Sequence, residues 1–418
     1  MQVVILAAGK SSRFYPYNKD GHKSMFSLCG KPILAWALDS LKNAGINEII
    51  VVVSPKDNKI KDFLASFKGI NLKVVEQSQA LGMGNALLCA KALLKEKFFV
   101  VFAHLVNADQ YLNLFDLEKT KVDGQILADI TNEPWKYGII KAEGNRAYGI
   151  KEKPRKGEKS SNIRSSGVYL LSRKFIEILA GIKESENTFE ETLDHCMKET
   201  NIEIILSKKA VMPLKYPWDL MSIKDYLLEN LPEYKAKDSE IAKTATIRGK
   251  VIIESGVKIS DYSLIEGPAY IGKNALVGAY SILRENSVLE EGAQLERYVD
   301  CARSIVGKNS HIHSGFIGDS IVGQDCSIGA GFITANKRID RGEIFVKMLD
   351  GKREPSGRKN LGAIIGHNVQ ISVNVATMPG KIIGNDCQVG PCLSVFENVP
   401  SGNKFYMDFT KFRKLEEK

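Results

Sequence analysis

An aliphatic residue recurs at every sixth position through the middle of the chain, and this period constrains the fold more than any other feature. The series is unbroken over Ile247, Ile253, Ile259, Ile265, Ile271, Val277, Leu283, Leu289 and Leu295. An α-helix needs a period near 3.6 and an isolated strand a period of 2. A period of six therefore predicts a repeat architecture, a β-helix whose short strands stack coil upon coil.

The pattern continues less strictly beyond Leu295 and is interrupted once. Aliphatic–glycine pairs recur through 306–329 and again through 365–384. Between Asn336 and Leu361 the chain is charged and carries Pro355. We expect this segment to leave one coil as a loop or hairpin, because excursions of this kind commonly form the binding face of a solenoid.

Length and composition set broad limits on the class of protein. A chain of 418 residues is long enough for two domains, and its net charge of +9 comes without a dense basic tract interleaved with aromatics. These features favour phosphorylated small substrates over nucleic acid. Seven scattered cysteines without a C-x-x-C pair suggest a reducing compartment and no structural zinc. The apolar N-terminal run is too short for a signal or a membrane span, so we expect a cytoplasmic protein without membrane partners.

The first part of the chain alternates strand and helix patterns. A buried strand over 2–8 is followed by Gly9 and a polar run, by an apolar helical pattern from Pro32, and by the strand at 48–54. This order predicts a Rossmann-like α/β domain, in which ligands bind where strands end at their carboxyl side. Arg13 and Lys23 would bring positive charge to a phosphate there. An ordinary strand-to-helix turn with exposed cations is the alternative.

The order of residues in this loop indicates a family. Leu6-Ala7-Ala8-Gly9, Arg13, Pro16 and Lys23 resemble the signature of sugar-1-phosphate nucleotidyltransferases. The segments at 77–86, 137–138, 152–154, 165–169 and 216–220 follow the order of that family's base-binding, sugar-binding and closing segments. The resemblance covers roughly residues 1–230 and lies in order and spacing.

The resemblance implies a site and a reaction. A sugar 1-phosphate would attack the α-phosphorus of UTP or dTTP, and pyrophosphate would leave, with Mg²⁺ neutralising charge. Arg13 and Lys23 would be the catalytic cations, and Asp219 would bind the metal. The nucleotide would be bound by Leu6, Ala7, Ala8, Gly9, Gln77 and Gly82. The sugar phosphate would be bound by Gly138, Glu152, Lys153 and Gly167.

Four positions depart from the family pattern. Ser11 replaces the second loop glycine, His22 replaces the proline before Lys23, and Met83 stands where a small residue is usual. The family's second metal-binding aspartate falls at His104, which is a poor ligand for an oxygen-rich magnesium site. Asp109 could serve instead if the strand end shifted by five residues.

A nucleotidyltransferase domain followed by hexapeptide repeats resembles the bifunctional N-acetylglucosamine-1-phosphate uridyltransferases and glucosamine-1-phosphate acetyltransferases, especially their archaeal-type relatives. The resemblance implies that the repeats form a left-handed parallel β-helix, which trimerises and binds acetyl-CoA between neighbouring coils. The expected domains are a nucleotidyltransferase-like domain over 1–232, a linker over 233–245, the β-helix over 246–400 and a tail over 401–418.

Two histidines in the repeats, His311 and His313, carry the predicted acetyl-transfer chemistry. Acetyl transfer to an amine needs a base, and histidine is suited to this near pH 7. Counting back from Gly318-Asp319 matches His313 to the family's base. A histidine metal pair lacks a third ligand nearby, whereas two plain surface histidines remain an alternative. The family pattern places Phe316 and Asn336 at the acetyl-transfer substrate and makes Lys347, Arg358 and Lys359 candidates for phosphate contacts.

The sequence therefore favours a transferase that makes nucleotide sugars of the UDP-N-acetylhexosamine type, and acetyl transfer is its better supported half. One alternative is an N-terminal domain that binds its ligand without turnover and serves regulation. Another is an active glucose-1-phosphate uridylyl- or thymidylyltransferase. A purely structural trimer would leave unexplained the match of the run from Ile328 to Asn336 to the acyltransferase pattern.

Overall fold

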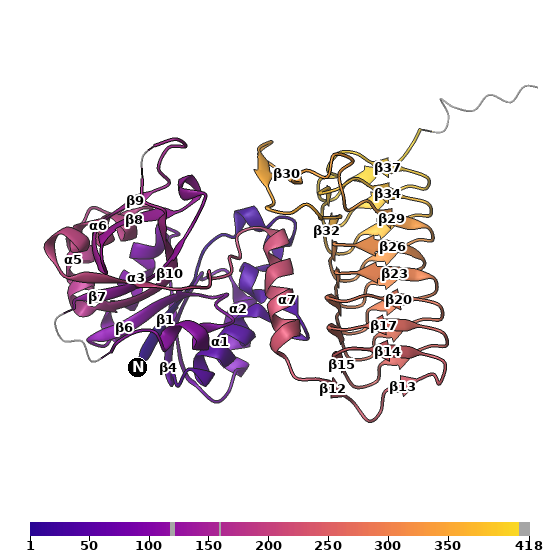
Figure 1. Cartoon of the computed structure of the whole chain (residues 1–418), viewed down its shortest axis with the longest axis horizontal. Coiled ribbons are helices and arrows are strands. Elements are labelled where there is room, and N and C mark those ends of the chain that lie inside the picture. The colour runs from indigo at the N-terminus through magenta and orange to yellow at the C-terminus, as the bar shows by residue number, and fades with distance from the viewer. Residues whose placement is uncertain (118–121, 159, 409–418) are drawn as a thin grey trace, which may run out of the picture. The chain divides into compact units, whose positions relative to one another are not determined.

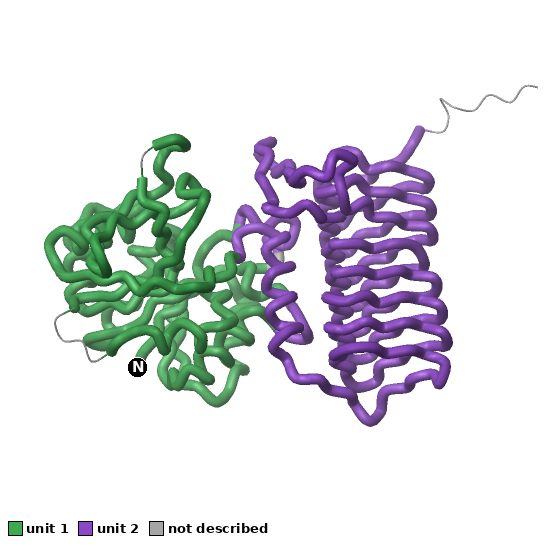
Figure 2. Tube along the Cα trace, viewed as in Figure 1, with its two compact units in different colours: residues 1–11, 20–26, 32–213 green, residues 12–19, 27–31, 214–418 purple. Residues whose placement is uncertain are grey.

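The computed structural model describes residues 1–117, 122–158 and 160–408. They divide into two compact units (Figure 2). Unit 1 comprises residues 1–11, 20–26 and 32–213, and unit 2 comprises 12–19, 27–31 and the chain from 214 onward. The first domain was expected to run unbroken over 1–232. Instead, two short segments of the N-terminal loop region and the residues after 213 pack with the repeats.

Unit 1 is built on a nine-stranded mixed sheet. Its order is β5 (Asn71–Glu76), β4 (Glu48–Val53), β1 (Gln2–Ala7), β6 (Lys97–Phe102), β10 (Ile163–Ser172), β7 (Gly124–Ile130), β11 (Ile202–Leu206), β9 (Arg146–Glu152) and β8 (Gly138–Glu143). Strand β1 pairs in parallel with both β4 and β6, whereas β10 runs antiparallel to β6 and β7. The chain therefore begins with an interior strand of the sheet, and the loop after β1 opens at the edge where the parallel strands have their carboxyl ends.

Helices cover both faces of this sheet because its central strands are apolar on both sides. Val3 and Ile5 pack toward α1 (Ile33–Asn43), α2 (Asn58–Ser66) and α4 (Ala108–Leu112). Val4 packs toward α3 (Gly82–Ala90), α5 (Arg173–Gly181) and α6 (Thr188–Glu199). Continuous burial along strands of a parallel sheet is the expected pattern for such a three-layer arrangement. The predicted Rossmann-like α/β domain is confirmed.

Unit 2 is a left-handed parallel β-helix with three sheets of stacked short strands (Figure 1). The first contains β12 (Tyr234–Lys235), β15 (Val251–Ile253), β18 (Ala269–Ile271), β21 (Ser287–Leu289), β24 (Ile305–Val306), β27 (Ile321–Val322), β32 (Ile364–Ile365) and β35 (Ile382–Ile383). The second contains β13 (Glu240–Ile241), β16 (Lys258–Ile259), β19 (Leu276–Val277), β22 (Gln294–Leu295), β25 (His311–Ile312), β28 (Ser327–Ile328), β33 (Gln370–Ile371), β36 (Gln388–Val389) and β38 (Lys404–Phe405). The third contains β14 (Thr246–Arg248), β17 (Leu264–Glu266), β20 (Ile282–Leu283), β23 (Val299–Ala302), β26 (Gly315–Gly318), β29 (Phe332–Thr334), β34 (Ala376–Thr377) and β37 (Ser394–Val395).

The sixfold aliphatic series forms the core of this β-helix. Each position from Ile253 to Leu295 in the series is buried, and Ile247 packs against the core at its open end. Three strands of six residues make one coil, so Leu264 pairs with Ile282 one coil later. The core is thus one aliphatic side chain per strand, stacked on the same position of the next coil.

The prediction of a linker at 233–245 is wrong. Strand β12 places Tyr234 beside Ile252, and β13 places Ile241 beside Ile259, so these residues already form the first coil. Charged residues made the sixfold pattern of this segment hard to recognise in the sequence, because the outward face of a strand tolerates charged side chains. At the other end β38 pairs with β36, so the repeats continue past residue 400 into the expected tail. The part of that tail at 409–418 lies outside the described residues.

The break in the repeat is a hairpin, as predicted. Strand β30 (Phe345–Lys347) pairs antiparallel with β31 (Arg353–Pro355) between two adjacent coils. Helix α7 (Leu220–Asn230) also belongs to unit 2, and the buried Lys224 donates hydrogen bonds from it to the carbonyl oxygens of Asn286 and Arg303. Among the described residues, none of the helices combines the length and apolar character needed to cross a membrane.

Candidate active sites

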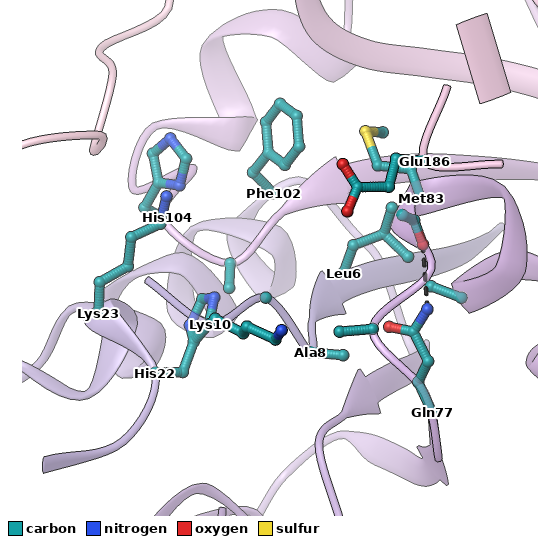
Figure 3. Close-up of a pocket in the computed structure, with 15 residues that line it drawn as sticks. Leu6, Ala8, Lys10, His22, Lys23, Gln77, Met83, Phe102, His104 and Glu186 are labelled. Atoms are coloured by element: carbon teal, nitrogen blue, oxygen red, sulfur yellow. Dashed lines mark hydrogen bonds between the residues drawn. The ribbon is translucent and has the colours of Figure 1, made fainter. Parts of the chain in front are cut away.

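A cavity of about 400 Å³ opens in unit 1 where β1 and β6 end (Figure 3). This volume lies in the range of small-molecule pockets. Its lining residues come from the ends of these strands, the loops after β1, β5 and β6, the start of α3 and the loop before α6: Leu6, Ala8, Gly9, Lys10, His22, Lys23, Gln77, Ala80, Gly82, Met83, Ala86, Phe102, Ala103, His104 and Glu186. The structure thus gathers most of the predicted nucleotide-binding residues in one place.

Ala7 is the exception among those residues. Leu6, Ala8 and Gly9 line the cavity, whereas Ala7 packs in the core on the opposite face of the sheet. Successive side chains of a strand point to opposite faces, so a run of four signature residues cannot all face one ligand. Only the backbone of Ala7 is left to contribute to binding.

Gln77 and Gly82 form one rigid corner of the cavity. The Gln77 Nε2 atom donates to the carbonyl oxygen of Gly82 over 3.0 Å and to Asn85 Oδ1 over 2.8 Å. Gly82 has a φ of +83°, and a Cβ there would lie 2.5 Å from the carbonyl oxygen of Glu186. This position therefore requires glycine, and the Gln77 carboxamide is fixed before any ligand binds.

His22, Lys23 and His104 make the polar side of the cavity, and both imidazoles are buried. Burial, together with a smaller effect of the charge of Lys23, lowers the pKa of His22 to about 3. Burial also lowers the pKa of His104 well below its ordinary value, with added effects from Lys23 and His22. Figure 3 shows the Lys23 side chain reaching toward His104. The two histidines are thus neutral, and Lys23 carries the positive charge.

These residues do not fit Mg²⁺ at the position of His104. Magnesium prefers oxygen ligands, but Glu186 brings the one carboxylate among the lining residues, and His104 is a neutral nitrogen ligand beside an ammonium group. The described residues contain no group of three or more histidine, cysteine, aspartate or glutamate side chains arranged for a metal. Asp109, the expected substitute, is not among the lining residues, and its Oδ1 atom accepts a hydrogen bond from Ser40 over 2.7 Å.

Two predicted residues of the phosphate and metal sites belong to unit 2. The Asp219 Oδ2 atom accepts hydrogen bonds from the backbone amides of Lys215 and Tyr216 over 2.6 and 2.7 Å, which caps the short 3₁₀ helix at Pro217–Asp219. Arg13 is exposed. Burial raises the pKa of Tyr216 far above its usual range, while the charge of Arg13 acts in the opposite direction. Arg13 therefore lies near Tyr216, in the segment 216–220 that resembles the closing segment of the family.

Of the predicted sugar-phosphate residues, Gly138 lies on β8, Glu152 and Lys153 lie at the end of β9, and Gly167 lies on β10. None of the four is among the residues that line the cavity. Gly138 pairs with Glu152 across the two strands, and a Cβ on Gly138 would meet the Glu152 carboxylate at 2.8 Å. Glu152 and Lys153 form an ion pair of 3.0 Å. Gly167 has a φ of +79°, and a side chain there would collide with the ring of Phe102, which does line the cavity.

In the β-helix, Glu296 lies beside both histidines. The His311 Nε2 atom is 2.7 Å from Glu296 Oε1, although the angle falls outside hydrogen-bond geometry, and the His313 Nε2 atom is 3.6 Å from Glu296 Oε2. Ile312 between the histidines is buried in the core. Because residues i and i+2 of a strand share a face, both imidazoles point outward to one carboxylate.

A second cluster of polar side chains is formed by Arg303, Asp319 and Asn336. Asn336 donates from Nδ2 to Asp319, and Asp319 accepts two hydrogen bonds from the Arg303 guanidinium at 2.8 and 3.1 Å. The ring of Phe316 occupies the space beside Gly318, where an added Cβ would also lie 2.9 Å from Asn336 Nδ2. Phe316 and Asn336, predicted to bind one substrate, are therefore neighbours.

Comparisons with known proteins show the family to which the chain belongs. Residues 2–219 match the family model described as nucleotidyl transferase. A Methanocaldococcus jannaschii protein named "Bifunctional protein GlmU" is 32% identical over 424 residues, covering 100% of both chains. A Sulfurisphaera tokodaii protein named "Bifunctional sugar-1-phosphate nucleotidylyltransferase/acetyltransferase" is 30% identical and covers 97% of this chain and 100% of that one. The chain belongs to this family of bifunctional transferases. A UDP-glucose pyrophosphorylase structure covers 55% of this chain and 94% of its own, with a TM-score of 0.48 and 20% identity.

Sequence reasoning missed Glu296 in this bifunctional transferase. Strand β22 pairs with β25 so that Gln294 lies beside His311 and Leu295 beside Ile312. The coil between them is one residue shorter than the 18-residue coils before it. Once that shorter coil is known, Glu296 falls beside His313. The interruption of the sixfold period after Leu295 is the sequence signal from which the position of Glu296 beside His313 could have been predicted.

Proposed function

We propose that this chain acetylates an amino-sugar 1-phosphate with acetyl-CoA and then transfers a nucleotide to the product. The observation that carries the proposal is the cluster of Glu296, His311 and His313 on the outward face of one β-helix, in a full-length relative of bifunctional transferases. A base held by a neighbouring carboxylate is the arrangement that acyl transfer requires.

The acetyl-transfer step uses His313 as the general base. The imidazole takes a proton from the attacking amine, the nitrogen forms a bond to the acetyl carbonyl carbon, and the carbon–sulfur bond breaks. The proton passes to the leaving coenzyme A thiolate, which leaves as the thiol. Glu296 stabilises the imidazolium that forms in between, because an opposite charge at this distance favours the charged form. Asn336 and Phe316 hold the sugar.

The nucleotidyl-transfer step takes place in the cavity of unit 1. UTP or dTTP binds with its base at Gln77 and Gly82 and its phosphates at Gly9 and Lys23. The 1-phosphate oxygen of the sugar attacks the α-phosphorus, and pyrophosphate leaves. Lys23 offsets the developing negative charge. Since the cavity does not fit Mg²⁺ at His104, this half is the slower one.

The neutral His104 in the cavity favours a second candidate function for unit 1, in which it binds a ligand without nucleotidyl transfer. A cavity with neutral histidines and one lysine suits a nucleotide or nucleotide sugar that binds without reacting. In that case unit 1 senses the product and regulates acetyl transfer. Wild-type protein that binds UTP but releases no pyrophosphate in the presence of Mg²⁺ and an N-acetylated sugar 1-phosphate would favour this function.

The acetyl-transfer site is completed by further copies of the chain in a homotrimer. Three exposed tyrosines, Tyr262, Tyr280 and Tyr298, stack with ring centroids 5.2 and 5.4 Å apart on successive coils. Exposed aromatic stacks suit an interface. Tyr298 is next to the site, because its carbonyl oxygen accepts from the amide of Gly315 in the coil that carries His313. Seven unpaired cysteines support a reducing compartment such as the cytoplasm.

Acetyl transfer is tested directly by incubating the purified full chain with acetyl-CoA and glucosamine 1-phosphate and following free thiol. The proposal expects thiol release that depends on the amino sugar. Other amino-sugar 1-phosphates in the same assay identify the substrate. If thiol release is independent of every amino sugar offered, acetyl transfer is not the function of the β-helix.

A further inference from the structure

The loop before α6 in unit 1 is fixed against the start of α3. The Ser185 amide donates to Thr188 Oγ1 over 2.6 Å, and the Thr188 hydroxyl donates back to the Ser185 carbonyl oxygen over 2.7 Å. The carbonyl oxygen of Glu186 in this loop lies against Gly82, the first residue of α3. The position of the neighbouring Glu184 is therefore set relative to that helix, although its side chain is exposed.

Glu184 holds the side chain of Asn85 on α3. Asn85 donates from Nδ2 to the Glu184 carboxylate, and its Oδ1 atom accepts from Gln77 Nε2 over 2.8 Å. The same Nε2 atom donates to the Gly82 carbonyl oxygen over 3.0 Å. A carboxylate and a backbone carbonyl can only accept hydrogen bonds. The two ends of this chain of groups therefore fix both carboxamides in one orientation.

The amide oxygen of Gln77 is consequently the atom that this side chain offers to a ligand. Within the described residues, both hydrogen bonds of the carboxamide come from its nitrogen. Figure 3 shows the nitrogen directed along its hydrogen bond to Gly82 and the oxygen pointing toward the part of the cavity near Ala8. This corner of the cavity therefore accepts a hydrogen bond from a nucleotide base. Uracil and thymine have an N3–H donor, whereas the N3 atom of cytosine has a lone pair.

We propose that Glu184 is a positioning residue that acts through Asn85 to present the Gln77 oxygen, and that unit 1 thereby prefers a uracil or thymine nucleotide to a cytosine nucleotide. The inference rests on the proposed function, which places the base at Gln77. Without an acceptor at Glu184, Asn85 is free to turn and to bring its own amino group against that of Gln77. Gln77 then meets a donor on one side and the Gly82 carbonyl on the other, so neither orientation of its carboxamide satisfies both neighbours.

Glu184→Lys tests the orientation directly, because an ammonium group can donate but cannot accept. Asn85 should then turn its oxygen toward the ammonium group. We expect the ratio of UTP affinity to CTP affinity, measured by calorimetry on the full chain without a sugar 1-phosphate, to fall by about 5- to 20-fold, mainly through weaker UTP binding. Glu184→Gln can still accept from Asn85 and should keep the wild-type ratio. Glu177→Lys, which makes the same change of charge at an exposed position of α5, should keep it too.

A second substitution separates positioning from a general loss of structure. In the Glu184→Lys background, Asn85→Asp supplies a carboxylate that pairs with the ammonium group and still accepts from Gln77. We expect this double variant to recover the wild-type preference for UTP, which general damage to the loop would not allow. A Glu184→Lys protein with the wild-type ratio would overturn the inference, and so would a loss that Asn85→Asp fails to restore.

The behaviour of the wild type distinguishes a failure of this inference from a failure of the proposed function. Wild type that binds UTP more tightly than CTP but releases no pyrophosphate would overturn nucleotidyl transfer, and the affinity ratios of the variants would then decide the inference. Wild type that binds UTP and CTP equally and releases pyrophosphate from both would overturn the inference and support nucleotidyl transfer. Wild type that binds neither nucleotide would overturn both.

Discussion

The Nε2 atom of His311 lies 2.7 Å from the Oε1 atom of Glu296, one coil earlier in the β-helix. The second oxygen of the same carboxylate is 3.6 Å from His313. One carboxylate thus serves two imidazoles on a shared face, and the role of each histidine has to be separated by substitution.

Replacing His313 with alanine should lower the rate of acetyl transfer by about 10²- to 10⁴-fold, the usual contribution of a general base. The side chain is exposed, so the fold and the assembly state should not change. His311→Ala is the matched control and should lower the rate much less. A His313→Ala enzyme with normal turnover, or a His311→Ala enzyme that is equally inactive, would contradict the assignment.

Glu296→Gln tests whether the carboxylate acts through the base. The amide keeps the size of the side chain and removes the charge that stabilises an imidazolium. We expect kcat for acetyl transfer to fall by up to about fivefold with little change in KM, because an exposed charge pair of this kind contributes about 0.2 to 1 kcal/mol. Glu291→Gln, an exposed carboxylate paired with Lys308, is the control and should leave kcat unchanged. Equal effects of the two substitutions would show that Glu296 has no special role.

The sequence predicted the β-helix well because its core repeats one side chain at a fixed period. Ile253 and Leu295 are seven strands apart, yet both occupy the same inward position. The period also predicted the hairpin, where the repeat stops. It failed at the first coil, because Tyr234 and Lys235 show no aliphatic signal, and only their pairing with Ile252 and Ile253 reveals the strand.

The site was predicted less completely, for a different physical reason. Motif order located Gln77, Gly82 and His104, which line one cavity. No local pattern predicts that Tyr17 binds the carbonyl oxygen of Ile365, a contact between residues 348 positions apart. Such contacts depend on backbone carbonyls, which every residue carries, so the sequence around Ile365 holds no mark of its partner.

His104→Asp should create a divalent-metal site in unit 1. An aspartate supplies the hard anionic oxygen that Mg²⁺ prefers, and it would pair with the charge of Lys23 in the metal-free protein. We expect pyrophosphate release to rise above the wild-type rate, which should lie below the typical enzyme value of about 10 s⁻¹. Binding of Mn²⁺, followed by electron paramagnetic resonance, gives a readout that is independent of activity. Wild-type turnover at the usual enzyme rate would refute the idea of a weakened metal site.

Tyr280→Ser should weaken the trimer. Tyr280 is the middle ring of the stack and contacts both Tyr262 and Tyr298, so its loss removes two ring contacts at once. Sedimentation velocity of the full chain at micromolar concentration should show a trimer for wild type and a shift toward monomer for the variant. Tyr148→Phe, an exposed tyrosine of unit 1, is the control. A wild-type monomer at this concentration would exclude the interface.

Glu290 should make the stability of unit 2 depend on pH. Its side chain is 3% exposed, its Oε2 atom accepts from the backbone amide of Gly30 over 3.0 Å, and burial raises its pKa from 4.5 to about 7. The folded state thus holds a proton that the unfolded chain releases above pH 4.5. The stabilising effect is complete below pH 4.5, declines as the pH rises, and is lost above pH 7.

At high pH the folded wild type bears the cost of an ionised, buried carboxylate. Glu290→Gln removes that cost because the amide is neutral at every pH. At pH 8 the variant should therefore be more stable than wild type, by up to about 3 kcal/mol from a shift of this size. At pH 4.5 the difference should vanish, because the wild-type carboxyl is then protonated in the folded state. Thermal unfolding midpoints at the two pH values measure the effect, with Glu291→Gln as the exposed control on the same coil. A gain in stability that is equal at both pH values would mean that the ionisation of Glu290 is not its cause.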